Sequence, residues 1–196
     1  ATYAALDPAS TFFVIPFRNT GGTGLYAAES AKRRVNYDVD DIGDIIQQLR
    51  ERAIEVSLHG IDSWHSQSGA RVERQRVIDG DRPLGVRMHW LLYAPETPVT
   101  LEKASFDYDS TFGYNDAVGY RPGTGQAYRP LGCSRLLELP MIVQDSSLFY
   151  PSRMGLSATE AQSVIDSIID HYAACGGIMT VNWHQRRLGP ERQWRR

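Results

Sequence analysis

The sequence predicts an α/β fold whose parallel strands form a barrel or a barrel-like open sheet. Short apolar runs alternate with amphipathic, helix-like segments along most of the chain. The runs are almost continuously apolar, which is typical of strands covered on both faces, and right-handed crossovers make such strands parallel. The glycines after the first run, Gly21, Gly22 and Gly24, lack the G-x-G-x-x-G spacing of a dinucleotide-binding fold.

Length and composition indicate a single domain over residues 1–196. The chain has 42% hydrophobic and 22% charged residues, and a chain of this size can bury about 70% of its unfolded surface. A net charge of −2 provides no field that would attract nucleic acid. The longest apolar run, residues 12–17, is too short to span a membrane. The compartment stays open, although the lack of a signal peptide at Ala1 weighs toward the cytoplasm.

The first half of the chain contains two predicted strands and two predicted helices. Residues 11–17, TFFVIPF, are β-branched and aromatic, and residues 55–58 form a second apolar run. Asp38 can cap a helix between these strands. The apolar positions of that helix recur at helical spacing: Val39, Ile42, Ile45, Ile46 and Leu49. Residues 70–78 are charged and predict a surface helix.

The second half contains four predicted strands and two predicted helices. The strands are expected at residues 85–92, 106–111, 136–143 and 178–183, and a short helix at 96–104. The clearest helix begins at Ser157, because Ser157 and Glu160 have the spacing of a capping box. Its apolar stripe comprises Ala161, Val164, Ile165, Ile168, Ile169 and Tyr172.

Three of the five histidines fall at or near the carboxyl end of a predicted strand. They are His59, His89 and His184. Residues at this edge of a parallel α/β sheet converge on one site even when they are far apart in sequence. Imidazole is both a common zinc ligand and the usual proton shuttle near neutral pH. His65 lies in a polar loop, where it could be either a metal ligand or part of the loop surface. His171 is expected on the surface of a helix.

Six short motifs occur in an order that resembles a known family. They are TFFVIPF, HGIDSWH (residues 59–65), GVRMHWL (85–91), FDYDSTFGYNDAVGYRPGT (106–124), LLELPMIVQDSSLF (136–149) and TVNWH (180–184). Together they resemble a polysaccharide deacetylase of the NodB-homology, carbohydrate-esterase type, over nearly the whole chain. The resemblance implies a distorted (β/α) barrel with a divalent metal, usually zinc, in a groove at the strand ends. It also implies a hydrolase that removes N-acetyl groups from a polysaccharide or sugar substrate.

The resemblance assigns metal ligands to histidines of this chain. His59 matches the family's first metal histidine, but Ser63 stands where a second histidine follows four residues later. Either His89 or His65 could supply the missing nitrogen. We favour His89, because a strand end is stiffer than a loop and holds a ligand better.

Catalytic and substrate roles follow from the same resemblance. His184 matches the family's general acid. Arg121 matches an arginine that orients the site or grips substrate, with a buried salt bridge to a nearby aspartate as the alternative. Trp90 lies beside His89 in sequence and could stack on a sugar ring, or it could be an ordinary core aromatic.

One departure from the family concerns its aspartate pair, which lies on a strand before T-F-F. Here Asp7 lies in a loop-like stretch, and the aspartates of residues 37–41 open a helix. We therefore expect a chain that lacks its first strand and is incomplete at both ends. Two other readings stay open: a deacetylase-fold amidohydrolase acting on a non-sugar amide, and a non-catalytic carbohydrate-binding relative.

Overall fold

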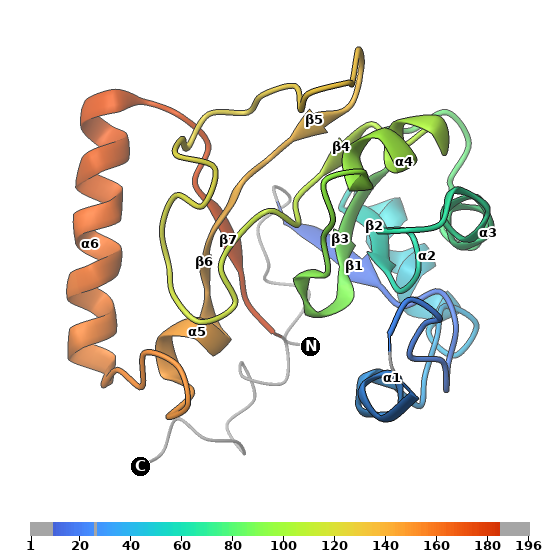
Figure 1. The fold of residues 1–196 in the computed structure, drawn as a ribbon, viewed down its shortest axis with the longest axis horizontal. Coiled ribbons are helices and arrows are strands. Elements are labelled where there is room, and N and C mark those ends of the chain that lie inside the picture. Colours follow the sequence, from blue (N-terminus) through green and yellow to red (C-terminus); the bar gives the residue numbers. More distant parts are fainter. Residues whose placement is uncertain (1–9, 26, 185–196) are drawn as a thin grey trace. The chain divides into compact units, whose positions relative to one another are not determined.

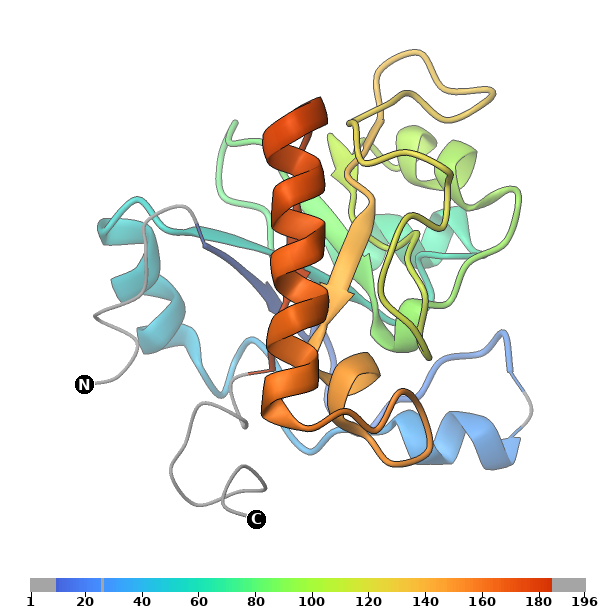
Figure 2. The same ribbon diagram turned by 90° about the vertical axis from the view of Figure 1, so that its left-hand side faces the viewer.

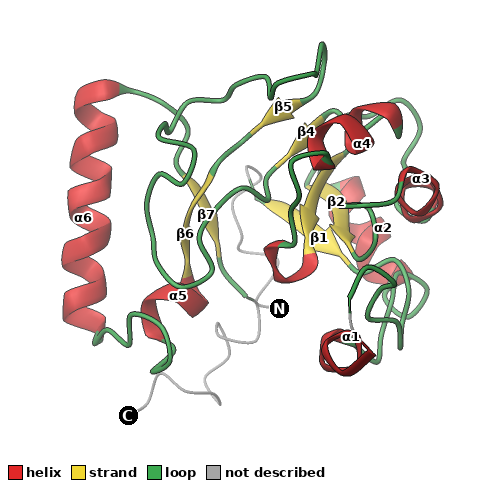
Figure 3. Cartoon of the chain, viewed as in Figure 1, coloured by secondary structure: helices red, strands yellow, loops and turns green. Residues whose placement is uncertain are grey.

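The computed structural model describes residues 10–25 and 27–184 (Figures 1 and 3). The chain divides into two compact units. The first unit comprises Ala1–Asp109 and Arg129–Leu137, and the second comprises Ser110–Tyr128 and Glu138–Arg196. The expected single domain stays a prediction, and Asp7 lies outside the described residues.

The first unit is built on a parallel sheet. β1 (Thr11–Val14) pairs with β2 (Glu55–Gly60), β2 with β3 (Gly85–Met88), and β3 with β4 (Tyr108–Asp109), each in parallel. Strands that follow one another in sequence are therefore neighbours in the sheet, without the reversal of order found in doubly wound folds. This confirms a parallel α/β architecture, and closure into a barrel stays a prediction.

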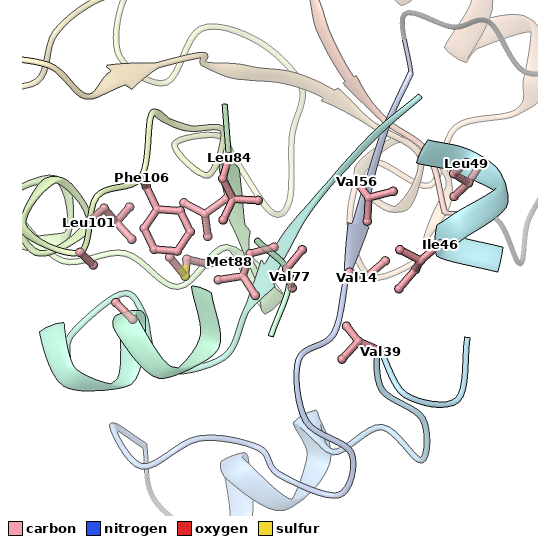
Figure 4. Close-up of a cluster of buried hydrophobic side chains, with 14 of the residues drawn as sticks. Val14, Val39, Ile46, Leu49, Val56, Val77, Leu84, Met88, Leu101 and Phe106 are labelled. Atoms are coloured by element: carbon pink, nitrogen blue, oxygen red, sulfur yellow. The ribbon is translucent and has the colours of Figure 1, made fainter. Parts of the chain in front are cut away.

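Among its described residues this unit has four helices, and the last three of them contribute side chains to its apolar core. They are α1 (Ala27–Arg33), α2 (Gly43–Glu51), α3 (Gln67–Gln75) and α4 (Thr97–Lys103). Figure 4 shows Ile46 and Leu49 of α2 beside Val14 and Val56 of the strands. On the other side of the cluster, Leu101 of α4 and strand residue Met88 are completely buried. The alternation of strand and helix in the sequence thus gives one continuous core.

Two predicted elements of this unit differ from the structure. β3 stops at Met88 rather than at residue 92, because Trp90 and Leu91 have positive φ values of 65° and 53° that a strand cannot accommodate. The expected cap at Asp38 is wrong, since α2 begins at Gly43 and has no side-chain cap. The Asp38 carboxylate instead accepts the backbone N–H groups of Arg18 and Asp40.

Among its described residues, the second unit contains two parallel strands and two helices. β6 (Met141–Gln144) leads directly into α5 (Asp145–Phe149) and pairs with β7 (Thr180–Asn182). The strand expected at 136–143 is split in two, because Pro140 separates β6 from β5 (Leu137–Glu138).

α6 (Ala158–Cys175) is the longest of the described helices (Figures 1 and 2). It begins with the capping box predicted at Ser157 and Glu160. Five residues of its predicted stripe belong to the apolar cluster around β6: Ala161, Val164, Ile165, Ile168 and Tyr172. Ile169 is outside the stripe and is 47% exposed. Within the described residues, no helix combines the length and apolarity needed to cross a membrane.

A carboxylate on α4 anchors the segment that leads to β5. Glu102 accepts the backbone N–H groups of Ser134, Arg135 and Leu136 at 2.9, 2.7 and 2.9 Å. These hydrogen bonds stabilise the charged form and lower the pKa of Glu102 to about 2. The charged carboxylate therefore holds this segment in place.

Replacing Glu102 by Gln tests this anchor through its pH dependence. Because the folded-state pKa is lowered, the stabilisation is complete above the ordinary pKa of 4.5 and is lost as the pH falls toward about 2. We expect Glu102→Gln to lower the melting temperature at pH 7, and the difference from wild type to narrow steadily between pH 4.5 and pH 3. Circular dichroism melts measure it, with the exposed Glu51→Gln as control. A difference that is constant over this pH range contradicts the anchor.

Candidate active site

The parallel register brings two of the predicted histidines together in the first unit. His59 lies on β2 opposite Arg87, and His89 follows β3 directly. Nε2 of His59 lies 3.0 Å from Nδ1 of His89. The two rings meet edge to face, with centroids 4.9 Å apart and an interplanar angle of 77°. The structure therefore pairs His59 with the histidine that we favoured as the second ligand.

The other nitrogen of each ring determines which tautomer the pair adopts. Nδ1 of His59 lies 2.9 Å from the carbonyl oxygen of Arg87, and Nε2 of His89 lies 3.0 Å from that of Arg33. A carbonyl oxygen only accepts, so both of these nitrogens carry a proton. In two neutral rings, the nitrogens that face each other then both hold lone pairs. Such a contact is repulsive unless a proton or a metal cation lies between them.

This arrangement fits two ligands of one metal ion. Histidines that bind metals usually donate their other N–H to a carbonyl or carboxylate, as both rings do here. Two imidazole nitrogens sharing a tetrahedral zinc ion lie about 3.3 Å apart, because each Zn–N bond is about 2.0–2.1 Å long. The observed separation is 3.0 Å. No cluster of three or more His, Cys, Asp or Glu side chains suited to a metal occurs among the described residues, so they supply two nitrogens to such a site.

The loop after β2 is held by a buried carboxylate on α3. Glu73 is 4% exposed and accepts the N–H groups of Ile61 and Asp62 at 3.0 and 2.7 Å. It also accepts the hydroxyl of Ser63 at 2.5 Å. Burial raises the pKa of Glu73, and these hydrogen bonds oppose that rise. Ser63 thus helps Glu73 to hold the loop that follows His59.

His65 lies in a different environment from the histidine pair. Its Nε2 is 3.2 Å from Oδ1 of Asp62, which also accepts the N–H of Thr23 at 2.7 Å. The His65 ring packs against Trp64, with centroids 4.6 Å apart. The structure gives His65 an ionisable partner within its own loop, and its role as a metal ligand stays a prediction.

Arg33 is a buried residue that the sequence analysis missed. Its side chain is among the largest that are fully buried, and the residue is 1% exposed. It donates to the carbonyl oxygens of Gly21, His89 and Ile61 at 2.6, 2.9 and 3.3 Å. Burial lowers the pKa of Arg33, although a guanidinium stays charged. No motif in the sequence distinguishes Arg33 from its basic neighbours Lys32 and Arg34.

Trp90 is exposed beside the histidine pair. Its ring centroid lies 6.1 Å from that of His89, and 46% of the residue is exposed. The backbone of Trp90 is left-handed, with φ 65° and ψ 17°, which costs a non-glycine residue about 1–2 kcal/mol. The turn buries Leu91 and directs Trp90 outward. The reading of Trp90 as a core aromatic is therefore wrong, and its contact with substrate stays a prediction.

The second unit pairs His184 with a buried carboxylate. Nδ1 of His184 lies 2.6 Å from Oδ1 of Asp145, and its backbone N–H donates to Oδ2 at 3.3 Å. Asp145 is 0% exposed, and its Oδ1 also accepts the N–H of Ser146. A carboxylate on Nδ1 orients an imidazole so that Nε2 can transfer a proton. Asp145 was missed, although an aspartate directly after the apolar strand at residues 141–144 was a usable signal.

Arg121 lies in the second unit on an exposed loop. Its guanidinium packs over the Phe112 ring at 4.4 Å and donates to the carbonyl oxygen of Gly113 at 3.0 Å. Because Arg121 is exposed, the alternative of a buried salt bridge is wrong. Its contact with substrate stays a prediction. The convergence of His184 with His59 and His89 also stays a prediction, since His184 belongs to the other unit.

Comparison with known proteins gives a likeness of fold. The sequence matches no protein-family model and no curated protein. The structure is similar to one titled "Crystal structure of putative polysaccharide deacetylase from Mycobacterium smegmatis", with a TM-score of 0.53 and 22% sequence identity. The match covers 74% of this chain and 55% of that chain, so this chain spans little more than half of its neighbour. The chain is thus similar in fold to a protein that its title calls a putative polysaccharide deacetylase.

Proposed function

We propose that this chain carries the active site of a metal-dependent hydrolase that removes N-acetyl groups from a carbohydrate. The observation that carries the proposal is the 3.0 Å contact between His59 Nε2 and His89 Nδ1, both of which hold lone pairs in neutral rings. The fold likeness to a protein titled a putative polysaccharide deacetylase supports the choice of reaction and substrate. The six motifs that resemble those of this family support it further.

Hydrolysis of an acetamide needs an activated water, stabilisation of the tetrahedral oxyanion, and a proton for the leaving amine. In this proposal His59 and His89 hold a divalent cation, and their nitrogen donors favour zinc. When bound, such an ion supplies a Lewis acid that polarises the acetyl carbonyl and makes a water more acidic. Both histidines keep their donor nitrogens aimed at the ion, because the carbonyl oxygens of Arg87 and Arg33 hold the opposite sides of the rings.

His184 is proposed as the general acid. As the water oxygen bonds to the acetyl carbon and the C–N bond breaks, Nε2 of His184 donates its proton to the departing amine. The proton that the water loses passes to solvent, and His184 is reprotonated from solvent before the next turnover. Asp145 holds Nδ1 at 2.6 Å and stabilises the protonated ring before the transfer. Proton transfer by a positioned side chain contributes about 10²–10⁴-fold to rate. The proposal requires His184 to reach the same substrate as the histidine pair.

Trp90 and Arg121 are proposed as contacts to the substrate. An exposed indole offers an apolar face on which a sugar ring can stack. Arg121 is already positioned by Phe112 and Gly113, and its exposed guanidinium can donate to sugar hydroxyls or to the acetyl oxygen. His65 is left outside the proposed metal site, because its ring packs against Trp64 and it is His89 that lies within 3.0 Å of His59.

Zinc binding tests the histidine pair. We expect wild-type protein to bind one zinc ion, and His59→Ala or His89→Ala to weaken binding at least 100-fold with the circular dichroism spectrum unchanged. Each variant removes one of two protein nitrogens from the ion. Competition with a chromophoric chelator measures affinity, and His171→Ala, on the exposed side of α6, is the control. Zinc affinity that survives both substitutions contradicts the pair, whereas loss in His65→Ala would assign His65 as a ligand.

Replacement of His184 tests the general acid. His184→Ala should lower kcat on an N-acetylated oligosaccharide about 10²–10⁴-fold, and zinc affinity should stay within twofold of wild type. Asp145→Asn should lower kcat as well, because the amide no longer favours the protonated ring. Acetate release measures turnover. An unchanged kcat contradicts this role, and wild-type protein that binds glycan and zinc without releasing acetate supports a non-catalytic binding protein instead.

Trp90→Gly separates substrate binding from stability. Glycine adopts the left-handed backbone without strain, so the melting temperature should stay the same or rise. KM for the oligosaccharide should rise about tenfold, which corresponds to about 1.4 kcal/mol. Ser105→Gly is the matched control, since Ser105 is exposed and has the same φ of 65°. A lower melting temperature with unchanged KM would show that Trp90 has a structural role only.

A further inference from the structure

Arg33 and His89 are joined by two reciprocal hydrogen bonds. The guanidinium of Arg33 donates from Nη2 to the backbone carbonyl of His89 at 2.9 Å. The ring of His89 donates from Nε2 to the backbone carbonyl of Arg33 at 3.0 Å. The side chain of each residue thus holds the main chain of the other. Together the two bonds determine both where His89 lies and how its ring is turned.

The same guanidinium connects the segments that follow three neighbouring strands. Gly21 lies in the loop after β1, Ile61 follows β2 directly, and His89 follows β3 directly. Arg33 donates to a carbonyl oxygen in each of them. A planar guanidinium offers five N–H donors in a fixed fork, which a lysine ammonium cannot reproduce.

Negative charge near Arg33 offsets the cost of burying it. The carboxylates of Asp62 and Glu73 favour its charged form against the effect of burial. Glu73 also accepts the N–H of Ile61, whose carbonyl accepts from Arg33. The backbone at Ile61 is therefore held from both sides, by a buried anion and a buried cation. Hydrogen bonds from buried charged side chains therefore reach the carboxyl end of β2, which carries His59, as well as that of β3.

We propose that Arg33 is a positioning residue that sets His89 with Nδ1 facing Nε2 of His59. Its carbonyl oxygen selects the Nε2-protonated tautomer of His89, and its guanidinium fixes the backbone from which the ring projects. The metal ion assigned to the two histidines rests on the proposed function, whereas the tautomer of His89 is independent of it. If Arg33 only joined loops, its loss would lower stability without changing the affinity of the pair for zinc.

Arg33→Lys tests this role, with Arg50→Lys as the matched control. Arg50 also donates to a backbone carbonyl, that of Val77 at 2.6 Å, and pairs with Asp79 in the same unit. We expect Arg33→Lys to weaken zinc binding about 10–100-fold, the range seen when the support of metal histidines is lost, because lysine cannot reproduce the guanidinium hydrogen bonds that hold the backbone of His89 beside the carbonyl of residue 33. Arg50→Lys should stay within twofold of wild type. Both variants are compared at matched fractions folded, from melts in the same buffer.

A second measurement uses metal-free protein. Long-range ¹⁵N NMR spectra of the imidazoles should show Nε2-protonated His89 and Nδ1-protonated His59 in wild type. In Arg33→Lys the His89 signals should report a mixture of tautomers, while those of His59 stay as in wild type. If Arg33→Lys does not fold, the wild-type spectrum alone tests the proposal, because Nδ1-protonated His89 in wild type would overturn it.

The outcomes separate this inference from the proposed function. Wild-type zinc affinity and an unchanged His89 tautomer in Arg33→Lys would overturn the positioning role while leaving the metal site intact. The opposite result is also possible: wild-type protein binds no zinc but shows the expected tautomers, and Arg33→Lys no longer shows the expected tautomer of His89. In that case the positioning role stands and the metal proposal fails.

Discussion

The contact between Nε2 of His59 and Nδ1 of His89 is the constraint around which the first unit is organised. Each ring donates its other N–H to a backbone carbonyl, that of Arg87 or that of Arg33. The facing nitrogens lie 3.0 Å apart and, in neutral rings, present lone pairs to one another. The fold holds this repulsive arrangement in place through bonds on the far sides of both rings, as expected for donors arranged around a cation.

The parallel sheet explains why these two residues meet. β2 and β3 are adjacent and parallel, so their carboxyl ends lie at one edge, and the register places His59 opposite Arg87. His89 lies two residues beyond Arg87, where β3 has ended and the backbone turns. The left-handed residues that follow turn the chain back and leave Trp90 exposed beside the pair. One short strand end thus carries both the second histidine of the proposed metal site and the exposed ring proposed to contact substrate.

Sequence patterns predicted the elements that depend on local chemistry and missed those that depend on tertiary partners. Apolar runs located the strands, and Ser157 with Glu160 located the start of α6, because both patterns act within a few residues. The role of Arg33 depends on carbonyl groups from three separate segments, which no local pattern encodes. Asp145 and His184 are 39 positions apart in the sequence, so no local pattern indicates that they interact. The left-handed backbone of Trp90 could not be predicted either, because tryptophan has no preference for positive φ.

The central claim is that His59 and His89 share one metal ion, and anomalous diffraction from zinc-loaded crystals tests it most directly. Data collected on both sides of the zinc absorption edge locate the ion without assumptions about its ligands. The account predicts a single strong peak about 2.0–2.1 Å from both His59 Nε2 and His89 Nδ1. A peak at other residues, or no peak within bonding distance of either ring, would contradict it.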